Sequence, residues 1–340
     1  MAKLGEVCLL KAGKFVSAND ISPEYNKGLY PCFGGNGIRG YVADYTHDGE
    51  FPLIGRQGAL CGNVNLASGK FHATEHAVVV QPKIEMNVHW LYYALNAMNL
   101  GQYATGAAQP GLAVSKLETL SIEISNISEQ NKIAQTLYKV EQLVNFRKQQ
   151  LAKLDELVKA RFVEMFGDPI GNTKNLPVTK FVDVVKMQRG FDLPVQERKS
   201  DGMIPVYGSN GVLGYHDISK VKGGGVITGR SGTIGKVFYE KGEFWPLNTT
   251  LFSLNLHGND VVYLKYLLEL FDLSRFTEGT GVPTLNRNKF HDELIIDVPL
   301  DEQERFAAFV ERVDQQKQTI QQSFEKLELM KKALMQEYFG

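Results

Sequence analysis

The chain has 340 residues, of which 43% are hydrophobic and 22% charged, a balance typical of a soluble globular protein of about two domains. Its formal net charge of -1 excludes nucleic-acid attraction by bulk charge, so a nucleic-acid surface should be a local patch or be completed by a partner. The three cysteines form no CxxC pair, which argues against a disulfide framework or a zinc site. We find no signal peptide and no membrane span, and therefore expect a cytoplasmic protein.

A long internal repeat dominates the sequence. Residues 30–37 (YPCFGGNG) recur 174 positions later as residues 204–211 (IPVYGSNG), and Gly55 and Gly229 begin matched glycine-rich loops at the same offset. One residue is lost within the second loop, and the offset is then 173 to the end of the chain. A constant offset over this length indicates a duplicated module.

The first part of each copy has the pattern of a mixed α/β domain. Short apolar runs between Gly and Asn turns, such as residues 77–80 and 225–228, predict strands. Residues 88–100 and 261–273 have helical spacing.

The second part of each copy predicts one long helix, with Ser128 and Asp301 as N-caps. Positions spaced alternately by three and four residues are apolar at seven of nine places in each helix, which predicts a narrow seam by which the helices pair. The alternative is that each helix lies on its own domain. The seam positions are Leu137, Val140, Val144, Arg147, Leu151, Leu154, Val158, Arg161 and Met165, and Val310, Val313, Lys317, Ile320, Phe324, Leu327, Lys331, Leu334 and Tyr338.

Several short motifs occur in a specific order. They are the Gly-Arg-x-Gly loops at Gly55 and Gly229, the run Trp245–Thr250, and Pro299 ahead of Glu302 and Gln303. With these motifs and its two-copy layout, the chain resembles the specificity subunit of type I restriction-modification systems over essentially its whole length. The resemblance implies an α+β fold with target-recognition domains at 1–125 and 168–298. It also implies two spacer helices, 126–167 and 299–340, that pair as an antiparallel coiled coil.

The resemblance also implies a function without catalysis by this chain. Each domain would read one half of a split, asymmetric sequence in double-stranded DNA, and the helices would hold two methyltransferase subunits, joined by motor-nuclease subunits. We expect no cofactor on this chain, with S-adenosylmethionine, ATP and Mg²⁺ in the partner subunits, and no membrane partner. The polar seam residues Arg147, Arg161, Lys317 and Lys331 are the candidates for partner binding. A coiled-coil interaction scaffold that binds no DNA is the alternative.

Catalytic motifs are missing from the sequence, and two motif-like patterns have simpler interpretations. Neither a Gly-x-x-x-x-Gly-Lys-Ser/Thr loop nor an Asn/Asp-Pro-Pro-Tyr/Phe run occurs. Residues 35–40 contain Gly-x-Gly-x-x-Gly, but the second copy has Ser209 in place of the first glycine, and a tight turn at Asn36 and Gly37 is the better interpretation. His72 and His76 have the spacing of metal ligands, but a third ligand is not evident.

Arg56 and Arg230 occupy the matched glycine-rich loops. Small neighbours let the backbone approach a ligand there, and a guanidinium group can bind guanine or phosphate. The alternative is that each arginine pairs with an internal carboxylate and holds its loop, because duplication preserves structural residues as readily as functional ones.

Residues that differ between the copies near these loops are candidates for sequence reading, because two halves that read different bases must differ. The alternative for each of them is a solvated loop side chain. The candidates are Gln57, Asn63, Lys70, His72 and Gln109 in the first copy, the last opposite Val282, and Ser231, Lys236, Asn286, Arg287 and Asn288 in the second, the last three opposite Ala113, Val114 and Ser115.

Overall fold

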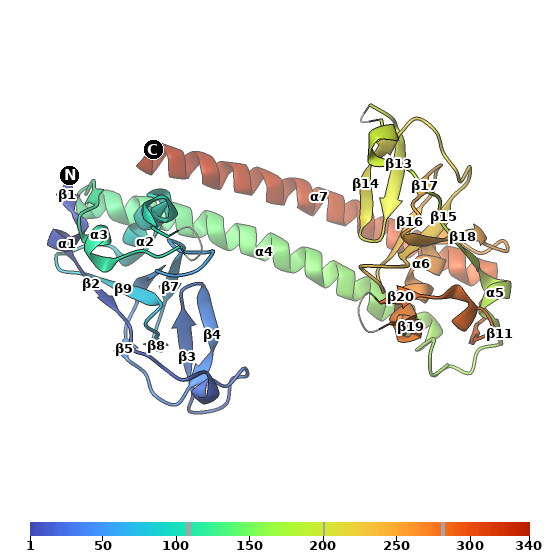
Figure 1. The fold of residues 1–340 in the computed structure, drawn as a ribbon, viewed down its shortest axis with the longest axis horizontal. Helices are drawn as coiled ribbons and strands as arrows, with labels where there is room; N and C mark the ends of the chain where they lie inside the picture. Colours follow the sequence, from blue (N-terminus) through green and yellow to red (C-terminus); the bar gives the residue numbers. More distant parts are fainter. Residues whose placement is uncertain (107–109, 200, 280–282) are drawn as a thin grey trace. The chain divides into compact units, whose positions relative to one another are not determined.

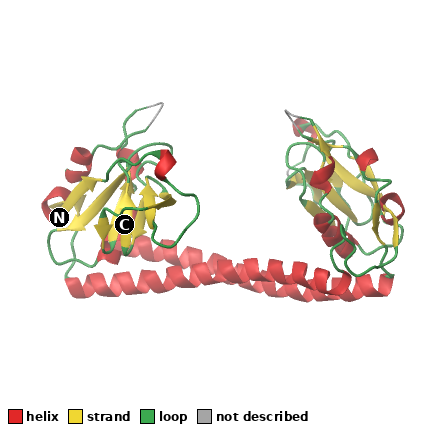
Figure 2. Cartoon of the chain, turned by 90° about the horizontal axis from the view of Figure 1, so that it is seen from below, coloured by secondary structure: helices red, strands yellow, loops and turns green. Residues whose placement is uncertain are grey.

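The computed structural model describes residues 1–340 except 107–109, 200 and 280–282. It divides into two compact units: unit 1 comprises Met1–Lys148 and Ser323–Gly340, and unit 2 comprises Gln149–Gln322. Each unit contains a globular part of strands and short helices together with halves of two long helices (Figure 2).

Unit 1 contains two four-stranded sheets (Figure 1). Neighbouring strands of the first sheet are all antiparallel, whereas β3 and β8 in the second are parallel. The first sheet has the order β2 (Cys8–Ala12), β9 (Ala77–Pro82), β6 (Phe51–Gly55), β7 (Val64–Ala67), and the second has the order β4 (Gly37–Val42), β3 (Tyr30–Gly34), β8 (Lys70–Ala73), β5 (His47–Asp48). The remaining elements are β1 (Ala2–Lys3) paired with β10 (Ser121–Ile122), α1 (Leu4–Val7), α2 (Val88–Ala97), α3 (Val114–Glu118) and the 3-10 turns η1 (Ala18–Asp20) and η2 (Leu100–Tyr103).

Unit 2 repeats this topology, strand for strand, in its larger sheet, and a register shift between Cys32 and Phe33 in β3 recurs between Val206 and Tyr207 in β13. The duplication thus extends to backbone irregularities. The larger sheet has the order β12 (Lys186–Arg189), β18 (Thr250–Asn255), β15 (Gly225–Gly229), β16 (Val237–Glu240), and the smaller has the order β14 (Gly211–His216), β13 (Ile204–Gly208), β17 (Trp245–Pro246). The other elements are β11 (Val178–Lys180) paired with β21 (Leu294–Ile296), β19 (Thr277–Glu278) paired with β20 (Thr284–Leu285), α5 (Phe181–Val184), α6 (Val261–Leu270), η3 (Val195–Glu197), η4 (Leu273–Phe276) and η5 (Arg287–Lys289).

The hairpin between β3 and β4 explains the glycine-rich run at residues 35–40. Gly34 pairs with Gly37, so that Gly35 and Asn36 form the turn, and Gly37 has a φ of 97° that favours glycine. The chain continues into a strand and not into a helix, as a dinucleotide-binding loop would require. The tight-turn interpretation is therefore confirmed, with the turn at Gly35 and Asn36, one residue earlier than predicted.

The short helices α2 and α6 begin at the predicted residues but end earlier than the spacing suggested. Side chains of Asn87 and Asp260 cap their N-termini by accepting hydrogen bonds from the backbone N–H three residues later. Asn99 and Asp272 then take left-handed conformations, with φ of 46° and 53°, and the chain turns into η2 and η4. A left-handed residue cannot continue an α-helix, which is why both helices are shorter than predicted.

The long helices are α4 (Ile127–Phe166) and α7 (Leu300–Phe339), and their predicted N-caps were wrong by two positions. Asn126 is the residue that caps α4, because its Oδ1 accepts a hydrogen bond from the N–H of Glu129 at 3.0 Å. The carbonyl of Pro299 accepts from the N–H groups of Glu302 and Gln303. Ser128 and Asp301 instead lie inside the first turn of each helix.

All eighteen predicted seam positions are buried or half-buried. Within unit 1, Glu141 of α4 pairs with Lys331 of α7 at 2.8 Å; within unit 2, Asp155 of α4 pairs with Lys317 of α7 at 2.5 Å. From the first pair to the second, the residue number increases along α4 and decreases along α7, so the helices run antiparallel. The predicted α+β class with an antiparallel helix pair is confirmed.

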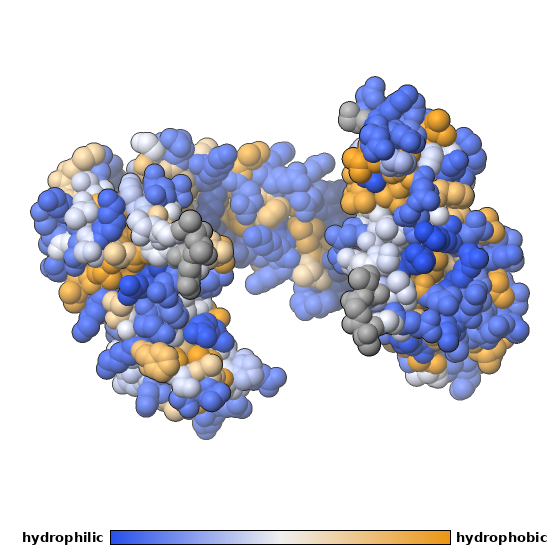
Figure 3. Space-filling model, in the orientation of Figure 1, coloured by the Kyte–Doolittle hydropathy of each residue, from blue (hydrophilic) through white to orange (hydrophobic). Residues whose placement is uncertain are grey.

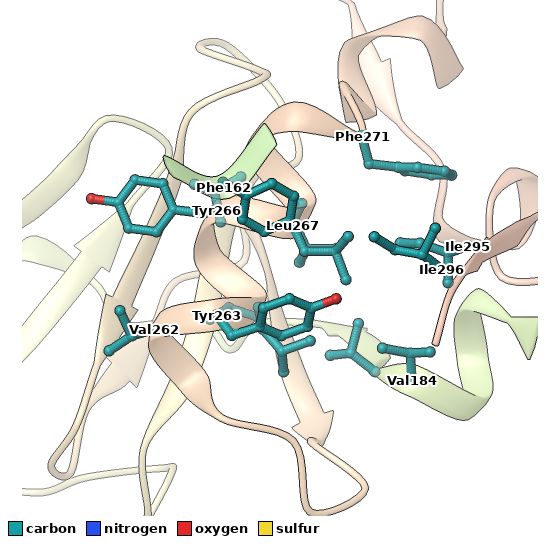
Figure 4. Close-up of a cluster of buried hydrophobic side chains, with 14 of the residues drawn as sticks. Phe162, Val184, Val262, Tyr263, Tyr266, Leu267, Phe271, Ile295 and Ile296 are labelled. Atoms are coloured by element: carbon teal, nitrogen blue, oxygen red, sulfur yellow. The ribbon is translucent and has the colours of Figure 1, made fainter. Parts of the chain in front are cut away.

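The same helices also complete the cores of the globular parts. In unit 1, Ile133 and Leu137 of α4 belong to the buried core, and Tyr338 of α7 packs against it. In unit 2, Phe162 of α4 stacks on Tyr263 of α6 at 5.7 Å between ring centroids and lies within the main apolar cluster (Figure 4). Each helix therefore pairs with the other long helix and also lies on a domain, so both packing alternatives are correct.

Candidate nucleic-acid interface

Arg56 and Arg230 hold equivalent places, directly after β6 and β15, and their backbones are fixed in the same way. The N–H of Arg56 donates to the carbonyl of His76 at 3.0 Å, and the carbonyl of Arg56 accepts from Leu112 at 2.9 Å. In unit 2, Arg230 makes the matching bonds to Thr249 and from Leu285 at 2.8 and 2.7 Å. Backbone bonds therefore hold both loops without using the guanidinium groups.

Neither side chain has a carboxylate at ion-pair distance in the part of the chain that the structure describes. Arg56 is half-buried and its Nε lacks a hydrogen-bond partner. Gln57, the next residue, is exposed and lines an open hollow of about 490 Å³ with Asn36, Arg39 and His76. These polar groups are available to an external ligand.

The predicted pair of differing residues Asn63 and Lys236 occupies one structural position. The Asn63 amide donates to Oδ1 of Asn36 at 2.8 Å, and the Lys236 ammonium donates to Oδ1 of Asn210 at 2.8 Å. Asn36 and Asn210 are matched turn residues of the two hairpins. The fold thus keeps the contact but changes its charge between the copies.

Lys70 and His72 lie on β8 in different surroundings. Lys70 is exposed, with its Nζ 4.7 Å from the centroid of the Tyr45 ring, and Tyr45 raises the pKa of this ammonium group. His72 is 8% exposed, and its Nε2 lies 3.2 Å from the carbonyl oxygen of Lys14. Burial and an internal hydrogen bond account for His72, so we leave it out of the proposed DNA-reading set.

A cationic recess lies in unit 2, where the end of β12, the loop after β15 and the turn η5 meet. Arg189, Arg230 and Arg287 line one hollow of about 350 Å³, and Arg189 and Arg287 also line an adjoining hollow of about 560 Å³. Nε of Arg189 donates to the carbonyl of Asn248 at 3.3 Å. We call the two adjoining hollows the arginine recess.

Two acidic residues line the arginine recess, and each has a partner of its own. Glu278 pairs with Lys289 at 3.1 Å, and Asp192 accepts a hydrogen bond from the Asn248 amide. Burial, followed by the positive charge of Arg287, lowers the pKa of the neighbouring His291 imidazole. The protonated, cationic form of His291 is therefore disfavoured beside the arginines.

The predicted residues around Arg287 line the same recess. Asn286 and Asn288 are exposed on either side of it, and Oδ1 of Asn286 accepts from the N–H of Asn288 at 3.1 Å to shape the turn η5. Ser231 is half-buried and bridges to Thr284 across the loop. Gln109, the remaining candidate, lies outside the described residues.

Arg189 was missed by sequence reasoning. The strand register makes it equivalent to Ala12, because Arg189 lies opposite Leu251 as Ala12 lies opposite Val78. The separation here is 177 positions, and the intervening loop in the second copy is three residues shorter. The matched glycines Gly13 and Gly190 that follow were the one available sequence signal.

A second difference between the copies lies on the β14 hairpin strand. Val212, Leu213 and Tyr215 are about half exposed, and hydrophobic side chains gather over this hairpin in Figure 3. The positions equivalent to Val212 and Leu213 in unit 1 are Ile38 and Arg39. The hairpin surfaces therefore differ in charge.

The four seam cations proposed for partner binding all make contacts within the chain. Lys331 pairs with Glu141 and Lys317 with Asp155, as described above. Nε of Arg147 donates to Oγ of Ser323 at 3.2 Å, and Arg161 pairs with Glu164 at 2.8 Å. Contacts within the helices account for these residues. The structure therefore gives no independent support for assigning them to partner binding.

The residues that the structure describes contain neither a metal-ligand cluster nor a membrane-spanning helix. They include no group of three or more His, Cys, Asp or Glu side chains arranged to hold a metal ion. His76 pairs instead with Glu75 at 3.2 Å. They also include no helix with the length and apolar character needed to cross a bilayer.

The fold and the candidate surfaces define a duplicated α+β module whose copies share a backbone and differ in exposed side chains. A family model described as the type I restriction modification DNA specificity domain matches residues 1–156 and again residues 174–329. The chain therefore belongs to the type I restriction-modification DNA specificity family, as the resemblance implied.

Named relatives agree with this membership, and a solved structure has a similar fold. The chain is 52% identical over 143 residues to the Type I restriction enzyme EcoprrI specificity subunit of Escherichia coli, a match covering 42% of this chain but only 36% of that protein. It is 27% identical over 323 residues to a putative type I restriction enzyme specificity subunit of Haemophilus influenzae, covering 84% of this chain and 80% of the other. The fold matches that of a type I restriction-modification S subunit from M. genitalium with a TM-score of 0.70 at 18% identity, over 99% of this chain and 95% of that one.

Proposed function

We propose that the chain is the DNA-recognition subunit of a type I restriction-modification complex and that each globular domain reads one half of a bipartite, asymmetric site. The observation that carries this proposal is the duplication itself. The loops of Arg56 and Arg230 have the same backbone bonds, yet the surfaces around them carry different side chains. Two domains of one shape with different polar groups suit two half-sites of different sequence.

The chemistry of the complex would belong to other subunits. The relatives are named as specificity subunits of restriction enzymes, and this chain lacks the phosphate-loop and adenine-methyltransferase motifs. We infer that two methyltransferase subunits carry S-adenosylmethionine and take the target adenine out of the base stack. ATP and Mg²⁺ would belong to the motor-nuclease subunits. Another solved structure of similar fold, with a TM-score of 0.57, is described as showing complex assembly of a type I system.

The paired helices would set the distance between the half-sites. Helices of 40 residues are about 60 Å long, whereas successive major-groove sites on one face of DNA lie about 34–36 Å apart. The helices are therefore long enough to carry two domains over separate turns of a duplex.

The test is a domain replacement in the full chain, expressed with its methyltransferase subunit. Residues 1–125 are exchanged for the corresponding domain of another specificity subunit, and the methylated adenines are mapped by sequencing. We expect one half-site to change and the other to stay, because the copies have separate cores. The matched control exchanges residues 168–298, which should change the other half only. Simultaneous change of both half-sites would contradict independent reading.

The neutral net charge leaves one rival function, a coiled-coil scaffold that binds no DNA. DNA binding that weakens steeply with salt would support recognition. Binding to methyltransferase subunits without any DNA binding would support the scaffold.

A further inference from the structure

The arginine recess has more positive charge than its surroundings balance. In the part of the chain that the structure describes, none of Arg189, Arg230 and Arg287 has a carboxylate within ion-pair distance. Of the acidic groups in the recess, Glu278 pairs with Lys289, and Asp192 accepts a hydrogen bond from the neutral Asn248 amide, so one unpaired carboxylate stands against three guanidinium groups. Three neighbouring guanidinium groups repel one another, so an anion that enters the recess lowers the free energy of all three.

This charge is a property of the second copy alone. The matching positions in unit 1 are Ala12 for Arg189 and Val114 for Arg287, so that Arg56, the counterpart of Arg230, is the single arginine there. The arginine loop is held in the same way in both copies, since Leu112 and Leu285 donate equivalent hydrogen bonds to Arg56 and Arg230, although Val114 begins the α-helix α3 and Arg287 the 3-10 turn η5. The two added arginines therefore change the charge of an otherwise shared surface.

The form of the recess favours the sugar-phosphate backbone over a base. Arg287 is half-buried, and Arg189, although exposed, has its Nε held by the Asn248 carbonyl, so both guanidinium groups line a hollow in a fixed position, which suits the DNA backbone better than a base edge. Guanidinium groups bind phosphate oxygens with paired hydrogen bonds, and the ligand's negative charge supplies the compensation that the protein lacks. Asn286 and Asn288 are the exposed residues beside Arg287, and these amides are suited to base edges.

We propose that the arginine recess is a phosphodiester-binding site of the second domain, which holds the DNA backbone through Arg189, Arg230 and Arg287 while neighbouring residues read bases. The inference rests on the proposed function, because it assumes that the domain binds DNA. It makes the two halves of the chain unequal. The second domain supplies the larger salt-dependent, sequence-independent part of the affinity, and the first depends more on base contacts.

The test gives the full chain, with its methyltransferase subunit, the residues that unit 1 already has: Arg189→Ala with Arg287→Val. Binding to a labelled duplex that contains the mapped site, and to one that does not, is measured between about 50 and 200 mM salt. Each phosphate contact that is lost should make the negative slope of log affinity against log salt shallower by about 0.9, so we expect its magnitude to fall by roughly one to two. Affinity should fall by similar factors on both duplexes, with the methylated sequence unchanged.

Two controls accompany this variant. Lys222→Ala removes an exposed cation elsewhere in unit 2, 3.4 Å from Glu243, and should leave the slope as it was. Ala12→Arg places the missing charge in unit 1 on a half-buried strand end and should make the slope steeper. Melting temperatures of all variants show that they remain folded.

The outcomes separate the two proposals. Failure of the wild-type complex to bind DNA overturns the proposed function and this inference with it. Wild-type binding with an unchanged slope in the double variant overturns the inference alone. A changed base preference in the methylated sites also overturns it, because the arginines would then read bases and not phosphate.

Discussion

Gln130 and Gln303 are two buried side chains that fasten each domain to a long helix. Oε1 of Gln303 accepts from the N–H of Asp260 at 2.9 Å, and its Nε2 donates to the carbonyl of Val298 at 2.7 Å. Gln130 makes the same two bonds, to Asn87 and Ser125, at 2.9 and 2.8 Å. Each glutamine thus joins the start of the domain's short helix, the segment that follows its last strand and the first turn of the long helix.

We predict that Gln303→Ala lowers the free energy of unfolding by about 2–3 kcal/mol, since it leaves a buried N–H and a buried carbonyl without partners. Denaturant unfolding of the full chain measures the change. Gln130→Ala should cost a similar amount, because the contact is duplicated. Gln142→Ala, at an exposed site on the same helix as Gln130, should lie within about 0.5 kcal/mol of the wild type. A Gln303 variant as stable as that control would show that the contact is unimportant.

Single residues divide into those that the sequence could predict and those that it could not. The repeat identified Gln303 as a matched residue, but its role depends on two carbonyl and amide partners that no sequence pattern specifies. For Arg230, likewise, the sequence predicted the loop position but not that Arg189 lines the same hollow. Because the counterpart of Arg189 in the first copy is Ala12, a comparison of identical residues between the copies does not identify Arg189. His72 was predicted as a surface residue, and its burial follows from the parallel pairing of β8 with β3.

At the scale of the elements, charged residues inside the helix seam form a network with the domain. Lys331 of α7 pairs with Glu141 of α4, and the other oxygen of Glu141 accepts a hydrogen bond from Tyr93 of α2 at 2.9 Å. Burial, followed by the charge of Glu141, raises the pKa of the Tyr93 hydroxyl, so that it stays protonated and can donate. The side chains of Lys331 and Glu141 are 28% and 24% exposed, which makes their separation more costly than that of a surface pair.

Lys331→Met should therefore destabilise unit 1 by about 1–2 kcal/mol, because it leaves Glu141 charged and without its ammonium partner. Adding Glu141→Gln should recover most of this loss, since glutamine can still accept from Tyr93 without carrying a charge. Thermal unfolding of the single and double variants measures both effects. Lys148→Met, which removes a pair 3.9 Å apart with side chains 58% and 44% exposed, is the matched control and should cost little. No recovery in the double variant would contradict the proposed network.

The spacing of apolar residues predicted the seam of α4 and α7 because the pattern of three and four is local to each helix. It could not predict that the same helices also complete two globular cores. Phe162 and Phe306 lie outside the nine-residue seam in their helices, and their rings meet only in the folded unit 2, at 5.4 Å between centroids. Local periodicity reports one contact face of a helix, whereas these helices have two.

For the whole molecule, the division into units does not follow the order of the chain. Unit 1 takes its last helical segment, Ser323–Gly340, from the far end of the sequence. Leu334 and Tyr338 in that segment pack against the core that Leu137 of α4 helps to form. A domain is therefore completed only when the end of the other copy's helix reaches it, which ties the folding of one copy to the presence of the other.

This arrangement predicts that unit 1 can be built twice from one shorter chain. Position 149 of α4 corresponds to position 322 of α7, so residues 1–149 joined directly to residues 323–340 give one domain and one unbroken helix. Two such chains pairing antiparallel restore every contact of unit 1 in both halves, because each helix ends in the segment that the other domain needs. We expect a stable dimer, measured by sedimentation. With the methyltransferase subunit, it should methylate an inverted repeat whose two halves both equal the half-site of the first domain. The gap should match that of the parent, because the helices have equal lengths.

Residues 1–149 alone are the control, because they lack the apolar segment 323–340 and should therefore pair poorly. A hybrid that stays monomeric, or a dimer that methylates sites whose halves differ, would show that the domains and helix ends do not assemble in this way.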